Sequence, residues 1–249
     1  MSRAAHRAVL ASDVHLSPDD PATAEAFLAA LPRVAAGAER LYLLGDLFDA
    51  WIGDDLPEAD ALAHRVAATL RGIAAAGTAV ALGHGNRDFL LGERFAAACG
   101  ATLLPEAVVV RLAGQAVLLT HGDELCTDDA DYQRLRLQLR APGWQAGFLA
   151  QPRAVRLALA RRLRGESDSA KRDKPAAIMD VNPDAVAAAM RAHGVQALVH
   201  GHTHRPATHR FTLDGAPAVR RVLPDWDAAA GRGGFLVADE ADWHEVAAR

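Results

Sequence analysis

Short apolar runs alternate with Ala- and Leu-rich helical segments through the first third of the chain, and this alternation constrains the fold most. Strands are expected at residues 8–12, 40–45 and 78–83, and helices at about 22–36 and 58–76. Parallel strands joined by helices of this length form a sheet that is covered on both faces. The first third therefore predicts an α/β fold.

The pattern changes after residue 100. Residues 108–123 predict two antiparallel strands around a turn at 113–115. Residues 128–174 have helical periodicity that is broken near Pro142 and Pro152, which indicates a helical insertion rather than sheet.

The last quarter of the chain returns to strands. A helix is expected to start at Asn182-Pro183, followed by a strand at 196–200 and by short strands around an Asp214-Gly215 turn. A chain of 249 residues can form one large α/β domain. We therefore expect a single domain over residues 1–249, with a helical cap insertion at about 126–176.

Composition and charge exclude several classes of protein. The chain is 51% hydrophobic with a net charge of −4, which argues against global disorder and against general nucleic-acid binding. Cys99 and Cys126 form no CxxC pair, which suggests a reducing compartment. No signal-peptide core and no apolar run of about 18 residues is present, so we expect a cytoplasmic protein that can still rest on a membrane surface.

Five short polar segments each follow a predicted strand. Asp13 and His15 are two apart in a segment expected to be extended, so their side chains should leave on the same face, and His202 and His204 repeat that spacing. Ligands in open α/β sheets gather at the carboxyl ends of strands. The five segments are Asp13-Val14-His15, Gly45-Asp46 with Asp49, Gly85-Asn86-Arg87-Asp88, His121-Gly122-Asp123 and Gly201-His202-Thr203-His204.

The residue types in these segments suit divalent cations. Carboxylate, imidazole and amide oxygen ligands fit a metal such as manganese, whereas a structural zinc site would normally use cysteines. Taken singly, most of these segments are more often a turn or a capping pair, but three histidines in five residues around the GHTH segment seldom serve packing. Together, seven ligands exceed what one open catalytic metal uses, and with one bridging carboxylate they predict two four-ligand sites.

The order DxH, GDxxD, GN, HGD and GHTH resembles that of the calcineurin-like metallophosphoesterases. The resemblance implies a layered α/β/β/α-like sandwich of mixed sheets with a helical cap. It implies one cation on Asp13, His15, Asp46 and His204, and a second on Asp46, Asn86, His121 and His202, with Asp46 as the bridge. We expect Asp46, Asn86, Arg87 and His121 to be the catalytic residues.

Arg87 stands where the generic family motif has a histidine that protonates an alcohol leaving group. An arginine cannot deliver a proton at neutral pH, but it can bind a phosphoryl oxygen with two donors. A phosphate leaving group has a second pKa of about 6 and departs without a proton. Arg87 therefore favours a pyrophosphate substrate.

Longer stretches resemble one branch of this family, the pyrophosphohydrolases that cleave UDP-2,3-diacylglucosamine in lipid A synthesis. The stretches are residues 44–55, 121–133, 178–182 and 200–206. This resemblance implies that water attacks the α-phosphorus and releases UMP and 2,3-diacylglucosamine 1-phosphate. It implies substrate contacts at Asn86, Arg87, Asp129, Tyr132, Ser167, Lys171, Lys174 and His202, although Lys171 stands where an asparagine is usual.

The insertion is strongly basic. Residues 134–174 contain eleven basic and three acidic side chains, a local charge of +8, together with bulky apolar residues such as Trp144 and Phe148. One interpretation is a solvated, arginine-rich face on an ordinary helical hairpin. The other is a cap that receives acyl chains and whose basic rim meets phosphates and the cytoplasmic face of the inner membrane, where the protein would be peripheral.

Two alternatives remain open. A phosphodiesterase, nuclease or nucleotide pyrophosphatase on the same scaffold would be expected to have a histidine at the position of Arg87. A scaffold used only for protein contacts normally lacks metal ligands, whereas all seven are present here. We therefore expect an enzyme with two Mn²⁺ ions, and neither a nucleic acid nor an obligate protein partner.

Overall fold

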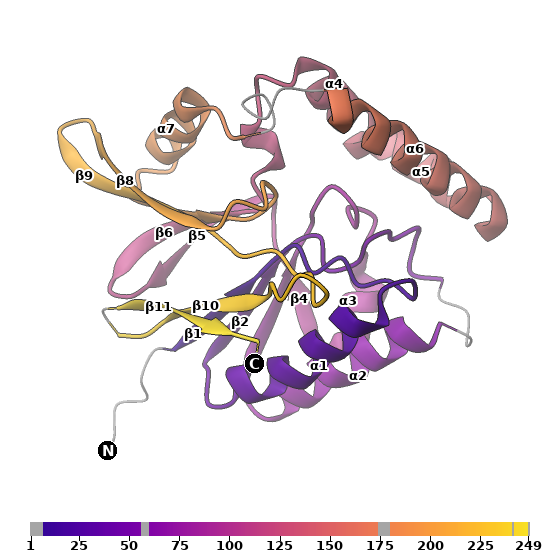
Figure 1. Ribbon diagram of the computed structural model, residues 1–249, viewed down its shortest axis with the longest axis horizontal. Helices are drawn as coiled ribbons and strands as arrows, with labels where there is room; N and C mark the ends of the chain where they lie inside the picture. Colours follow the sequence, from indigo (N-terminus) through magenta and orange to yellow (C-terminus); the bar gives the residue numbers. More distant parts are fainter. Residues whose placement is uncertain (1–6, 56–59, 174–179, 241, 249) are drawn as a thin grey trace.

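Two β-sheets pack face to face and are flanked by helices (Figure 1). This computed structural model describes residues 7–55, 60–173, 180–240 and 242–248. In those ranges, no helix combines the length and the apolar character needed to cross a membrane.

The first sheet has six strands in the order β11-β10-β1-β2-β3-β4. Strands β1 to β4 are parallel, and β10 and β11 extend the sheet antiparallel beyond β1. The central strands are apolar on both faces, as expected for strands buried between two layers. The bounds are β1 Ala8–Ala11, β2 Arg40–Leu44, β3 Ala79–Gly83, β4 Ala101–Leu103, β10 Gly234–Ala238 and β11 Trp243–Ala247.

Three helices cover one face of this sheet: α1 (Pro21–Ala35), α2 (Ala61–Ala75) and α3 (Glu93–Cys99). The side chains of Asp20 and Asp60 cap α1 and α2 by accepting from backbone N–H groups three residues later. The buried faces of the helices supply large core side chains, of which Phe27, Leu70 and Phe95 are fully buried.

The second sheet has five strands in the order β5-β6-β7-β9-β8. One face packs on the first sheet through residues such as Leu10, Leu44 and Leu119, and the other packs on α7 through Leu198 and Met190. The protein is therefore an α/β/β/α sandwich with mixed sheets, which confirms the predicted fold class. The bounds are β5 Ala107–Leu112, β6 Gln115–Thr120, β7 Ala197–His200, β8 Ala207–Leu213, β9 Ala216–Val222 and α7 Pro183–Ala192.

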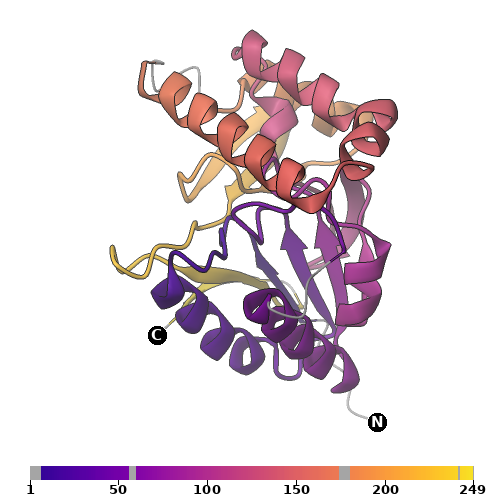
Figure 2. The ribbon, with the colours of Figure 1, turned by 90° about the vertical axis from the view of Figure 1, so that its right-hand side faces the viewer.

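Three further helices lie over the carboxyl ends of the central strands (Figures 1 and 2). After the short 3-10 helix η1 (Asp123–Leu125), the chain forms α4 (Ala130–Arg140), α5 (Pro142–Leu149) and α6 (Arg153–Asp173). Pro142 opens α5 and Pro152 precedes α6, so the predicted breaks separate the three helices. We call α4, α5 and α6 the cap helices.

Two elements between β3 and β5 were not predicted from the sequence, namely α3 and β4. They have seven and three residues, which is too short for hydrophobic periodicity to identify them. Gly100 ends α3 in the left-handed conformation, with φ of 67°, and β4 pairs with β3 directly afterwards.

Candidate metal centre

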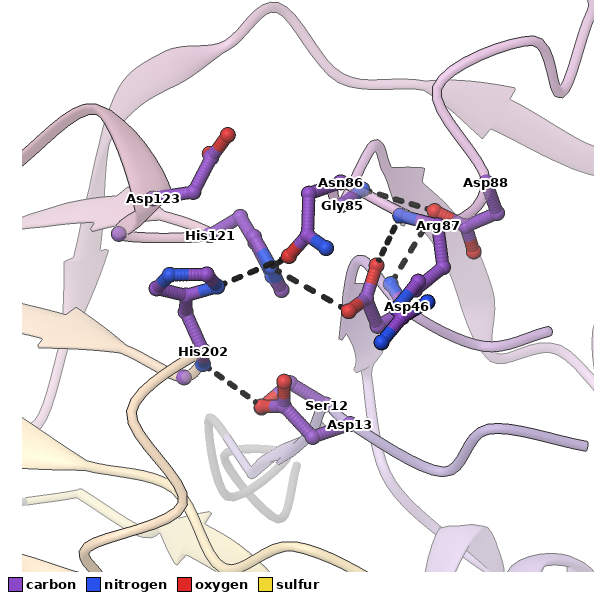
Figure 3. A network of polar contacts seen from close by, with 12 residues as sticks. Ser12, Asp13, Asp46, Gly85, Asn86, Arg87, Asp88, His121, Asp123 and His202 are labelled. Carbon is purple, nitrogen blue, oxygen red and sulfur yellow. Dashed lines mark hydrogen bonds and ion pairs between the residues drawn. The ribbon is translucent and has the colours of Figure 1, made fainter. Parts of the chain in front are cut away.

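All five polar segments lie at one edge of the sandwich. They follow β1, β2 and β3 in the first sheet and β6 and β7 in the second. Because these strands are parallel within each sheet and the two sheets pack face to face, their carboxyl ends meet. Figure 3 shows Asp13, Asp46, Asn86, His121 and His202 pointing toward one another from these loops.

Small residues allow the loops to approach so closely. A Cβ atom on Gly85 would overlap the carboxylate of Asp46, and a Cβ atom on Gly201 would overlap Ser12 and Asp13. The glycines of the GN and GHTH motifs therefore serve backbone packing between the loops, and their neighbours carry the polar side chains.

Five of the seven side chains come from strained backbone. Asp13, His15, Asp46, His202 and His204 have φ between 51° and 66°, in the left-handed region that non-glycine residues seldom adopt. The prediction that an extended segment places Asp13 and His15 on the same face is therefore wrong. The chain turns sharply at both residues, and strain of this kind typically collects at functional sites.

One group of ligand atoms gathers around Asp13. His204 Nε2 lies 3.4 Å from Asp13 Oδ1 and 3.2 Å from His15 Nε2. Asp13 Oδ1 is buried without a hydrogen-bond partner, whereas Oδ2 accepts from the backbone N–H of His202 at 2.9 Å and from Ser12. A buried, unpartnered carboxylate oxygen that faces two imidazole nitrogens suits a bound cation.

A second group gathers around Asn86. Its Oδ1 lies 2.9 Å from His202 Nδ1 and 3.3 Å from His121 Nε2. Asp46 lies between the two groups, because its Oδ2 is 3.7 Å from His121 Nε2 and 3.8 Å from His15 Nε2. Within the described residues, ligand atoms of Asp13, His15 and His204, and of Asp13, Asp46 and His121, lie within 4.8 Å of one another.

Buried hydrogen bonds fix the loops that carry these side chains. Asp88 accepts from the backbone N–H groups of Asp46, Leu47 and Gly85 at 3.1, 2.8 and 2.8 Å, which joins two of the loops. His121 Nδ1 faces the carbonyl of Leu44 at 2.9 Å, which leaves Nε2 directed at the cluster.

The charges of the cluster oppose one another. Burial raises the pKa of Asp46, although His121 opposes the rise. Burial alone would lower the pKa of His121, but the carboxylates of Asp46 and Asp13 outweigh it and raise the value to about 9. Burial lowers the pKa of His15 to about 4. The buried carboxylates need nearby positive charge, which protons on the histidines supply when no metal is bound. A divalent cation can supply that charge instead, so the residues present fit divalent metal ions.

The neighbouring helix α4 is bound to Asp123, which follows the His121 segment of the site. Tyr132, Arg136 and Arg140 are spaced four residues apart and therefore lie on one face of α4. The Tyr132 hydroxyl and Arg136 Nε donate to Asp123 Oδ2 at 2.7 and 2.8 Å, and Arg140 Nη2 lies 3.6 Å from the same atom. Arg140 also donates to the carbonyl of Gly85 at 3.1 Å, beside Asn86.

A cavity of about 120 Å³ lies between the cap helices and the core. Asn86 is among the residues that line it, together with four arginines, Arg87, Arg136, Arg140 and Arg164. The rest of the lining is largely apolar and aromatic, and includes Trp51, Leu135, Leu139, Trp144, Phe148 and Leu163.

The structure describes the side chains of only some of the residues predicted to contact the substrate. Tyr132 stacks on His202 with a centroid distance of 6.0 Å, and the backbone N–H of Arg87 donates to Asp46 at 2.7 Å. Asp129 caps α4 by accepting from the N–H of Tyr132 at 3.1 Å. Ser167 and Lys171 lie on α6, whose side chains are not described there, and Lys174 lies outside the described residues.

Sequence reasoning missed four polar side chains near the cluster. Asp123 belongs to the HGD segment but was given no role, and Arg136 and Arg140 could have been found from their four-residue spacing after Tyr132. No pattern in the sequence pointed to Asp225, which is buried beside His204.

The comparisons with known proteins agree on one family of phosphoesterases. The family model described as calcineurin-like phosphoesterase matches residues 6–206. A protein of Bordetella pertussis named UDP-2,3-diacylglucosamine hydrolase is 55% identical over 92% of this chain and 90% of its own length. Proteins of the same name from Chromohalobacter salexigens and Pseudomonas paraeruginosa are 53% and 50% identical, over 90% and 95% of this chain and 90% and 96% of their own lengths.

Proposed function

This chain belongs to the calcineurin-like phosphoesterase family, and on that premise we propose that it hydrolyses the pyrophosphate bond of UDP-2,3-diacylglucosamine in lipid A synthesis. Water would attack the α-phosphorus and release UMP and 2,3-diacylglucosamine 1-phosphate. The relatives that carry this name cover most of the chain at 50–55% identity.

The observation that carries the proposal is the cavity beside Asn86. Its lining combines apolar and aromatic side chains with four arginines, Arg87, Arg136, Arg140 and Arg164. Such a lining suits a molecule that has both acyl chains and a diphosphate. A purely polar nucleotide would gain little from the apolar side chains of α4 and α5.

We propose that two Mn²⁺ ions bind at the cluster. Asp13, His15, Asp46 and His204 would hold one, and Asp46, Asn86, His121 and His202 the other, with Asp46 shared. When bound, such a pair of cations supplies Lewis acidity and a nucleophile at neutral pH. The mixed set of oxygen and nitrogen donors, without a thiolate, supports manganese over a structural zinc.

Side chains of this protein would stabilise the transition state and bind the substrate. Arg87 would donate to a phosphoryl oxygen and stabilise the negative charge that builds up on it. No general acid is needed, since the leaving phosphate departs without a proton. Asp129, Tyr132, Ser167, Lys171, Lys174 and His202 would hold the substrate, and the single domain's cap insertion at about 126–176 would receive its acyl chains.

The cap also supports a membrane location. The cap helices expose large apolar side chains in a segment rich in arginine, including Leu137, Leu149, Val155 and Leu157. Apolar contacts combined with basic residues favour anionic membrane surfaces. We propose that the protein is cytoplasmic and associates peripherally with the inner membrane.

The direct test is a reaction in water enriched in oxygen-18. Purified protein with Mn²⁺ and UDP-2,3-diacylglucosamine should form UMP that carries the label, because attack at the α-phosphorus adds the new oxygen there. Label in the lipid phosphate would contradict the proposed site of attack. Activity on simple phosphodiesters but none on this substrate would favour the alternative phosphodiesterase function.

A further inference from the structure

Asp225 lies next to the loop that carries His202 and His204. Strand β9 runs parallel to β7 with Val222 opposite His200, and the N–H of Leu223 donates to the His200 carbonyl at 2.7 Å. Both strands therefore end at the same edge, and the residues that follow them lie side by side. Asp225 is only 4% exposed there, although a carboxylate is seldom buried without a partner.

The side chain of Asp225 faces the nitrogen of His204 that points away from the cluster. Asp225 Oδ2 lies 3.7 Å from His204 Nδ1. The other nitrogen, Nε2, lies 3.4 Å from Asp13 Oδ1 and 3.2 Å from His15 Nε2. The imidazole ring of His204 thus lies between two buried carboxylates, one on each side.

Asp225 is itself held in place from two directions. Arg232 Nε donates to Asp225 Oδ2 at 3.1 Å. The backbone N–H of the next residue, Trp226, donates to the carbonyl of Asp13 at 3.1 Å, which ties this loop to the segment that carries Asp13. The carboxylate therefore has a defined position relative to both Asp13 and His204.

We infer that Asp225 is a positioning residue for His204. A neutral imidazole has one N–H, and a carboxylate next to Nδ1 favours the tautomer with the proton on that atom. The lone pair of Nε2 is then available to a divalent cation, and the ring is fixed toward the cluster. This inference rests on the proposed function, because it assigns His204 as a metal ligand.

A metal titration with a matched control tests the inference. We would titrate Mn²⁺ into metal-free protein by calorimetry, using the wild type, Asp225→Ala and Asp227→Ala. Asp227 is the control because it also accepts from Arg232, at 3.0 Å from Nη2, but from a more exposed position in the same loop. Asp225→Ala should weaken one of two binding events by about 10- to 100-fold, whereas Asp227→Ala should match the wild type.

A conservative variant separates positioning from a general effect on folding. Asp225→Asn keeps an oxygen next to Nδ1 but loses the charge, so its affinity should lie between those of the wild type and Asp225→Ala. If Asp225→Ala does not fold, the pair Asp225→Asn and Asp227→Asn decides in the same way. The unfolding temperature of each metal-free variant reports folding independently of the metal.

The outcomes distinguish this inference from the proposed function. Two binding events of wild-type affinity in Asp225→Ala would overturn the role of Asp225 and leave the metal centre intact. Equal losses in the Asp225 and Asp227 variants would also overturn it, since the pairing with Arg232 would then explain the effect. A wild type that binds no Mn²⁺ would instead defeat the proposed function, and this inference with it.

Discussion

At the scale of single residues, the centre depends on side chains held in unfavourable backbone. Five of the seven proposed ligands have positive φ, and Asp46 lies within 4 Å of histidines from both groups of ligand atoms. The loops tolerate this strain because buried hydrogen bonds, notably those to Asp88, determine their path. The fold alone therefore holds the proposed ligands in this arrangement.

Arg87 provides the sharpest prediction at this scale. Arg87→Ala should lower turnover of UDP-2,3-diacylglucosamine by about 10²- to 10³-fold, because one donor to the transition-state oxygens is lost. Metal content should not change, since the link from this residue to Asp46 uses the backbone N–H. Steady-state kinetics and elemental analysis check both parts, with Arg94→Ala, an exposed arginine on α3, as the control. Loss of metal in Arg87→Ala would show that the side chain has a structural role.

The residues of the site were predictable to different degrees. The five motifs could be found because each places several polar residues at the end of an apolar strand. Asp225 could not be found, because one acid after a strand is common and its partner His204 is 21 residues away in sequence. The backbone turns at Asp13 and His15 were also hidden, since non-glycine residues with positive φ have no sequence pattern of their own.

At the scale of elements, α4 joins the cap to the metal centre through a buried ion pair. Arg136 is 8% exposed and Asp123 is 1% exposed, and Asp123 lies two residues after His121. Burial would raise the pKa of Asp123, but nearby positive charges, first those of His121 and Arg140, hold it below its usual value. The position of α4 and that of the His121 loop are thus coupled.

This coupling predicts a large loss of stability from one arginine and a small loss from its neighbour. Arg136→Met should reduce the free energy of unfolding by about 3 kcal/mol, because it removes the closer of the two guanidinium groups that pair with the buried Asp123 carboxylate. Arg134→Met, which breaks an exposed pair with Asp131, should cost less than about 1 kcal/mol. Urea unfolding of the metal-free variants measures both. Equal losses would mean that the Asp123 pair is not an anchor.

The aromatic residues of α5 give a second prediction at this scale. Trp144 stacks on Phe148 with centroids 5.0 Å apart and contacts the cavity, so Trp144→Ala removes apolar surface from the proposed acyl site. The KM for UDP-2,3-diacylglucosamine should rise by about 10- to 100-fold, whereas hydrolysis of UDP-glucosamine should change little. Val109→Ala, at an exposed apolar side chain on β5 outside the cap helices, is the control. Equal effects of Trp144→Ala on both substrates would argue against acyl binding in this cavity.

The elements themselves were largely predictable from hydrophobic periodicity. The predicted strands and helices of the first third correspond to β1, α1, β2, α2 and β3, and the hairpin at 108–123 to β5 and β6. Contacts between distant segments determined the elements that periodicity did not show. The three-residue strand β4 exists because it adds to the edge of β3, and no local pattern could show that contact.

At the scale of the whole molecule, two sheets bring distant segments to one edge. Three loops come from the first sheet and two from the second, so the proposed metal centre spans the interface between the sheets. A chain with only one of these sheets would lack either Asp13 and Asp46 or His121 and His204. The cap helices then cover that edge (Figure 2), with the cavity beneath them.

The central claim is that this edge holds two cations that share Asp46. Crystals grown with Mn²⁺ and measured near the manganese absorption edge test it most directly. The account predicts two anomalous peaks per chain, one beside Asp13, His15 and His204 and one beside Asn86, His121 and His202, with the Asp46 carboxylate between them. A single peak, or peaks away from these side chains, would contradict it.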